Sequence, residues 1–139
     1  MAELKTKKTD ASVDDFLNEL PAEQTRKDCF EIVRIMKQVT QAEPKMWGAN
    51  IIGFGSTRLK YPNGRELDWM AIGFSPRKQN LTFYLSSNVI ANTELLAKLG
   101  KYKTGGGCLY IKKLEGISVL VNILVQYTLN YIPDNSFVK

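Results

Sequence analysis

Basic side chains next to glycine are the residues of this chain best suited to chemistry, and that chemistry is the binding of an anion. Arg77 and Lys78 stand side by side in the polar connection Ser75–Asn80. Arginine binds phosphate or carboxylate through a planar fork, and a glycine-rich backbone offers N–H groups to the same anion. We therefore predict an anion or phosphorylated-metabolite site built from a basic turn and a glycine-rich loop. Its candidate residues are Arg77, Lys78, Lys101, Gly105 and Gly106.

The glycine run Gly105–Gly107 does not belong to a P-loop, because the pattern G-x-x-x-x-G-K-[ST] is absent. The alternative interpretation of this region is a flexible turn flanked by solubilising lysines.

Acids near the amino terminus form a second candidate site, this time for a metal. Clustered carboxylates attract hard cations such as Fe³⁺, Mg²⁺ or Ca²⁺. The alternative is that these acids only complement the dipole at the start of a helix. The candidate metal ligands are Asp14, Asp15, Glu19 and Glu23.

Trp47 is a third candidate, since a Trp–Gly pair where a helix gives way to a strand can line a ligand pocket. It can equally be a core aromatic whose indole N–H is bonded to the backbone. Glu66 and Asp68 could pair with Arg58 or Lys60 across a hairpin.

The residue inventory argues against an enzyme. The chain has no histidine, which removes the commonest general base. Its two cysteines, Cys29 and Cys108, lie inside apolar patterns and are expected to be buried, reduced thiols, with a disulfide or a metal pair as the alternative. No recognised catalytic motif is present, so we predict a non-enzymatic binding protein.

Charge is distributed unevenly along the 139 residues, whose net charge is +5. Residues 1–43 hold nine acids and seven bases, whereas residues 44–139 hold five acids and twelve bases. Such asymmetry can mark a binding face or only a solvated surface. Nucleic-acid binding is not expected, because the strand aromatics fit strands that pack on helices. These aromatics are Phe54, Trp69, Phe74, Phe83 and Tyr84.

The hydropathy and the amino-terminal sequence indicate where in the cell the protein is expected. No apolar run approaches the ~20 residues that span a bilayer, and MAELKTKKTD has no apolar stretch behind its charges. We expect a cytoplasmic protein without a membrane segment, with a disordered lead-in over 1–11, a single domain over 12–132 and a tail over 133–139.

Helix signals lie at both ends of the chain and strand signals in the middle. Ser12 is a helix cap, Pro21 suits the first turn of a second helix reaching about Gln41, and a third helix opens at Asn92–Glu94. In the second helix Asp28 is placed on the wetter side. The last helix is predicted from an apolar stripe over 117–132. The expected strands are 50–55, 57–61, 67–74, 81–85 and 108–112.

This order predicts an α+β fold: a two-layer sandwich in which amino- and carboxy-terminal helices pack on one antiparallel or mixed sheet of about five strands. Pro62–Gly64 is expected to form a tight turn between two of the strands. The oligomeric state is not predicted.

Several short motifs together resemble those of a known family. They include MWG at 46–48, GFG at 53–55, GFSPRK at 73–78 and CLYIKKL at 108–114. On these segments the chain resembles the YdhG-like bacterial domain of unknown function, over roughly residues 12–132.

The resemblance implies a compact α+β domain. One branch of the family is described as frataxin-like iron chaperones, which deliver iron for iron–sulfur cluster or haem assembly. For this chain the resemblance implies iron as the cargo and iron–sulfur or haem assembly proteins as partners, and the anion site is the alternative to this leading prediction. The matching surface acids would be Asp14, Asp15, Glu19 and Glu23.

Overall fold

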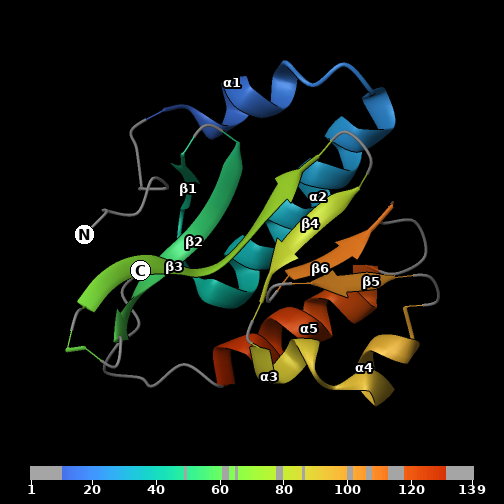
Figure 1. Cartoon of the computed structure of the whole chain (residues 1–139). Helices are drawn as coiled ribbons and strands as arrows, with labels where there is room; N and C mark the ends of the chain where they lie inside the picture. The colour runs from blue at the N-terminus through green and yellow to red at the C-terminus, as the bar shows by residue number, and fades with distance from the viewer. Residues whose placement is uncertain are drawn as a thin grey trace.

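The computed structural model describes residues 11–48, 50–60, 63–64, 66–77, 80–85, 87–99, 102–105, 108–112 and 118–130. The predicted lead-in and tail, apart from Ala11, lie outside these residues. The elements in chain order (Figure 1) are α1 Val13–Asn18, α2 Glu23–Thr40, β1 Pro44–Trp47, β2 Ile51–Lys60, β3 Glu66–Pro76, β4 Leu81–Tyr84, α3 Ser87–Ile90, α4 Thr93–Ala97, β5 Lys103–Gly105, β6 Cys108–Ile111 and α5 Ser118–Asn130.

The fold is α+β, with six strands in the order β1-β2-β3-β4-β6-β5 and every described pair antiparallel. The observed strands differ from the predicted ones in three places. Residues 50–61 were expected to form two strands, but β2 runs unbroken through Gly55. The short edge strands β1 and β5, and the helix α3, were not predicted, because four or fewer residues carry too little periodicity to stand out.

Strands β2 and β3 form the longest pairing in the sheet, and the predicted turn lies between them. Gly64 has a φ of 87°, the left-handed conformation that a glycine adopts without strain. The register places Arg58 opposite Asp68 and Lys60 opposite Glu66, so the backbone positions are compatible with the predicted cross-strand charge pairs.

Helix α2 starts two residues later than predicted. Ala22 is its N-cap and makes no side-chain cap hydrogen bond, so Pro21 lies before the helix and not in its first turn. Asp28, expected on the wet side, is only 7% exposed. It accepts a hydrogen bond of 2.8 Å from Gln24 Nε2 one turn earlier, and such a bond is what makes a buried carboxylate tolerable.

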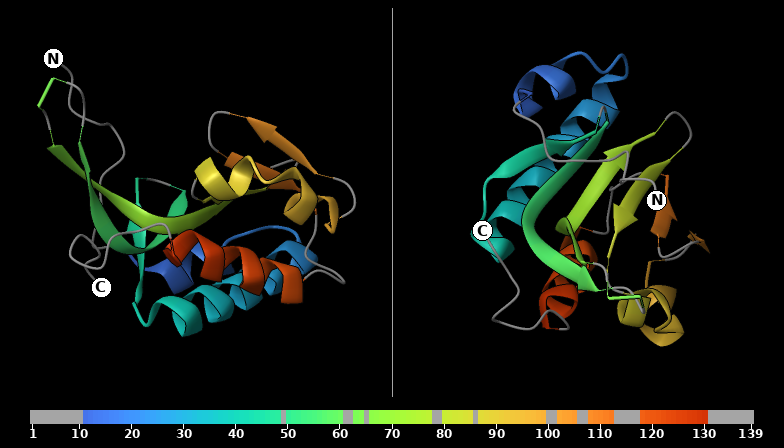
Figure 2. Two further views of the ribbon diagram at one scale, coloured as in Figure 1. Left: turned by 90° about the horizontal axis from the view of Figure 1, so that it is seen from below. Right: turned by 60° about the vertical axis from the view of Figure 1, so that its left-hand side comes forward.

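The molecule has two layers, and α2 and α5 lie side by side on one face of the sheet (Figure 2, left). The main core fills the space between the layers. Side chains from α1, α2, α3, α4 and α5 all enter this cluster, where they meet Ile52, Phe54, Ile72, Phe74 and Phe83 from the strands. We call the opposite side of the sheet the outer face.

The outer face has a small cluster of its own. Trp47, Ile51 and Met70 are buried there, with Trp69 and Tyr84 packed against them. All five residues come from strands, and the described helices contribute none. Trp69 and Tyr84 were grouped with the aromatics of strands that pack on helices, yet both rings pack against this outer cluster. Side chains alternate along a strand, so some aromatics of β3 and β4 must point away from the helical layer.

Candidate functional site

The predicted metal ligands are exposed and do not gather. Asp14 and Asp15 lie in the first turn of α1, Glu19 follows its end, and Glu23 opens α2. Within the part of the chain that the structure describes, no three acid, cysteine or histidine side chains come close enough to hold a metal ion.

Two of these acids have other surroundings. Glu23 pairs with Lys27 one turn later, at 3.4 Å between Oε1 and Nζ. Asp14 lines a shallow depression of about 340 Å³ together with Glu43 and Lys45. Glu23 therefore stands beside a cation, which weakens its attraction for a metal ion.

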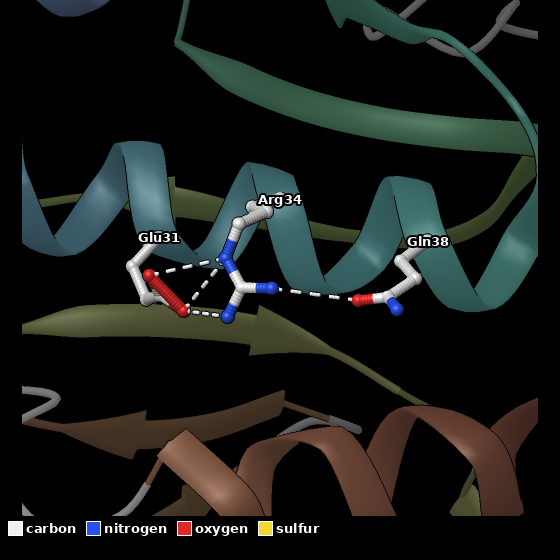
Figure 3. A network of polar contacts seen from close by, with 3 residues as sticks. All are labelled: Glu31, Arg34 and Gln38. Carbon is white, nitrogen blue, oxygen red and sulfur yellow. Dashed lines mark hydrogen bonds and ion pairs between the residues drawn. The ribbon is translucent and has the colours of Figure 1, made fainter.

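A larger groove of about 560 Å³ lies where α1 gives way to α2. Phe30 lies in it with 39% of its surface exposed. Glu31 and Arg34 line this groove and belong to the polar network of Figure 3, in which Arg34 Nε donates to both carboxylate oxygens of Glu31, at 3.0 and 3.3 Å. Arg34 NH1 also reaches Gln38 Oε1 at 3.4 Å. The hydrogen bond from Arg34 lowers the pKa of Glu31. The arginine is therefore compensated and is not free to hold a ligand anion.

Trp47 is buried, with 3% of its surface exposed. Burial is what the core-aromatic interpretation required. The predicted hydrogen bond from its indole N–H to the backbone is absent: Nε1 has no acceptor within the described structure. Trp47 also lies in strand β1 rather than at a helix-to-strand junction. Its ring stands edge-on to Trp69, with centroids 6.0 Å apart and an interplanar angle of 61°.

Arg77 is an exposed cation of the outer face. Its NH2 donates a hydrogen bond of 2.7 Å to the hydroxyl of Tyr84. By strand alternation Ser75 and Thr82, which are paired across β3 and β4, lie between these two residues on the same face. Both Ser75 and Thr82 are fully buried. The hydrogen bond between Arg77 and Tyr84 therefore passes over the small side chains of Ser75 and Thr82. Because these side chains are small, the bond lies close to the sheet.

The charge of Arg77 also reaches the neighbouring strand β6. Burial raises the pKa of the Cys108 thiol, while the positive charge of Arg77 and a hydrogen bond with Tyr110 act in the opposite direction. Cys108 is opposite Tyr84 in the β4–β6 register. Arg77, Tyr84, Cys108 and Tyr110 thus form one contiguous region of the outer face.

The predicted glycine-rich loop is only partly a loop. Gly105 belongs to strand β5, where it pairs with Cys108, and its carbonyl accepts a weak hydrogen bond of 3.4 Å from the Tyr110 hydroxyl. Gly105 therefore lies in an extended edge strand and not in the loop that was expected. Lys78, Lys101 and Gly106 lie outside the described residues.

Both cysteines are free thiols, as predicted, but only Cys29 is buried as expected, and Cys108 is partly exposed. Burial, followed by the nearby Asp28 carboxylate, raises the pKa of Cys29 to about 12. Both thiols therefore remain protonated at neutral pH and are poor nucleophiles. No described helix is long and apolar enough to cross a membrane.

Comparison with known proteins adds no relative. No protein-family profile matches the chain, and no curated protein and no solved structure matches it either. The resemblance to the YdhG-like domain therefore stays a prediction.

Three residues of the outer face were missed as site candidates: Tyr84, Tyr110 and Lys103. Lys103 is opposite Tyr110 in the β5–β6 register and is exposed. A sequence signal did exist, because between Trp69 and Leu114 there are seven basic residues and a single acid, Glu94. That run spans β3 to β6 and marks the positively charged region of the fold.

Proposed function

We propose that the chain is a small, non-enzymatic binding protein of the cytoplasm whose ligand is an anion held by Arg77 on the outer face. The proposal depends on a difference between Arg77 and the basic residues of α2, which is whether an acid pairs with them. Arg34 and Lys27 on α2 each pair with a glutamate. Arg77 has a neutral tyrosine hydroxyl as its partner, and no carboxylate lies within ion-pair distance of it among the described residues. Among the residues that the structure describes, no carboxylate therefore compensates its charge.

The bond to Tyr84 also favours binding through entropy. A free arginine loses much side-chain rotamer freedom when it captures a ligand, and that loss opposes binding. Tyr84 already holds the guanidinium over the sheet with one of its five N–H groups, so the remaining donors are available to a bidentate anion.

The absence of a prepared nucleophile among the described residues supports a binding role. The thiols of Cys29 and Cys108 are held in their neutral form by burial. Iron delivery to iron–sulfur or haem assembly proteins stays a prediction from the family resemblance, since Asp14, Asp15, Glu19 and Glu23 form no described metal group.

Calorimetric titration with inorganic pyrophosphate at low ionic strength tests the proposal. We expect saturable binding by the unmodified chain. Replacing Arg77 with Gln should weaken it about tenfold or more, because a hydrogen bond to a charged group contributes roughly 1.5–3 kcal/mol.

Arg34→Gln is the matched control, since it removes an exposed arginine that Glu31 already compensates. This variant should bind pyrophosphate as the unmodified chain does. Equal affinity for the Arg77→Gln variant and the unmodified chain would rule out the site, as would an equal loss in the Arg34→Gln variant.

A further inference from the structure

We infer that the anion is the phosphate backbone of single-stranded nucleic acid, whose bases stack on the rings of the outer face. This inference rests on the proposed anion site at Arg77 and adds a second, independent contact to it. The rings and the cations of the outer face are the two observations that lead to it.

Three partly exposed rings stand on neighbouring strands of this face: Trp69 on β3, Tyr84 on β4 and Tyr110 on β6. Tyr84 is opposite Cys108 and Tyr110 is opposite Thr82, so the two tyrosines are diagonal neighbours across β4 and β6. Such neighbours lie roughly 7–8 Å apart. Successive unstacked bases can reach rings at this spacing, and stacking on aromatic side chains is the usual way in which single strands are bound.

Cations flank these rings across the whole width of the sheet. Lys45 on edge strand β1 is opposite Gly53, and paired residues share a face, so its side chain lies on the side of Trp47. Lys103 is on the other edge strand, β5, and shares a face with Tyr110. Arg77 follows β3, between these two edges, so positive charge extends across the width of the face and suits a polyanion.

The form of the face favours a polymer over a free nucleotide. A small ligand gains most of its affinity from a concave pocket that buries it. The depressions of about 560 and 340 Å³ described above lie along α1, α2 and the edge of β1, whereas the rings and cations of the outer face are spread over several strands. A strand of linked nucleotides can instead add several weak contacts over an open surface.

Fluorescence anisotropy with a labelled oligothymidine of about ten nucleotides tests this inference, with an abasic oligomer of the same length as the second ligand. Tyr110→Leu removes a ring without touching the Arg77–Tyr84 bond. We expect it to weaken oligothymidine binding about five- to hundredfold, the effect of one stacked base, and to leave abasic binding unchanged. Tyr110→Phe keeps the ring and should keep the affinity.

Tyr127→Leu is the matched control, because Tyr127 is an exposed tyrosine (45%) on α5, in the helical layer. It should bind oligothymidine normally. Equal affinity for the oligothymidine and the abasic oligomer, with Arg77 required for both, would overturn base stacking and leave the anion site intact. An equally tight duplex, whose bases are already stacked, would also overturn it. Failure of both oligomers and of pyrophosphate would overturn the anion site as well.

Discussion

At the scale of single residues, two glycines allow the outer-face cluster to form. A Cβ on Gly53 would lie 2.6 Å from Cδ1 and Nε1 of Trp47 and 2.9 Å from Met70 Cβ. On Gly73 it would lie 2.6 Å from Met70 Sδ and 2.7 Å from the backbone oxygen of Ile52. Gly53 and Gly73 are paired across β2 and β3. Because neither glycine has a side chain, Trp47 and Met70 can pack directly on the backbone of β2 and β3.

We expect Gly53→Ala to destabilise the fold by about 1–3 kcal/mol, the usual effect of forcing an extra methyl into a filled site. The buried Trp47 cannot move toward solvent without exposing its indole. Denaturant unfolding followed by tryptophan fluorescence measures the change, and the native emission should shift as the Trp47 ring is displaced.

Gly105→Ala is the comparison for this prediction. The nearest atom to its added Cβ is Tyr110 Cε2 at 3.5 Å, an ordinary van der Waals contact. Its free energy of unfolding should stay within about 0.5 kcal/mol of the unmodified chain. If both glycine variants were equally stable, the close packing of Trp47 on Gly53 would not matter to the fold.

At the scale of elements, the two amino-terminal helices begin in different ways. Ser12 caps α1, and its Oγ accepts a hydrogen bond of 3.1 Å from the backbone N–H of Asp15, as the sequence predicted. Ala22 occupies the same position for α2 with a suitable extended conformation (φ −90°, ψ 122°) but has no side-chain acceptor. One helix start is therefore satisfied by its own side chain and the other is not.

This difference predicts opposite effects of two substitutions. Ser12→Ala should lower the free energy of unfolding by about 1 kcal/mol, because the Asp15 N–H loses its acceptor. Ala22→Ser should raise it by a similar amount. Thermal unfolding of both variants checks the pair. A loss of stability in Ala22→Ser would show that the contacts around residue 22, rather than the capping of α2, determine the effect of this substitution.

At the scale of the whole molecule, charge is divided between the two layers. The compensated ion pairs Lys27–Glu23, Arg34–Glu31 and Lys37–Glu43 all involve α2. The outer face presents Lys45, Arg77 and Lys103 without such partners among the described residues. Long-range attraction of an anion should therefore be directed to the sheet and not to the helices.

The binding of oligothymidine should consequently depend on salt. If three phosphates are neutralised, the slope of log K against log salt concentration should be about −2, since each contact on a single strand contributes roughly −0.7. Lys103→Gln should make the slope shallower by about one such contact. Lys27→Gln, whose lysine is paired with Glu23, should leave it unchanged. An unaltered slope for Lys103→Gln would remove β5 from the interface.

The sequence by itself determined the features that depend on neighbours along the chain. The Ser12 cap, the end of α2 near Gln41 and the tight turn at Gly64 all follow from local geometry. It also indicated Arg77, because an arginine in a polar turn suits an anion whatever surrounds it.

Only the tertiary structure decided which face of the sheet each aromatic occupies. Alternation shows that Phe83 and Tyr84 point in opposite directions, but it does not show which direction meets the helices. The strand order was equally hidden, because β4 pairs with β6 across two helices and an edge strand. That long-range pairing brings Tyr110 and Lys103 beside Arg77 and Tyr84, residues that the chain separates by some twenty positions or more.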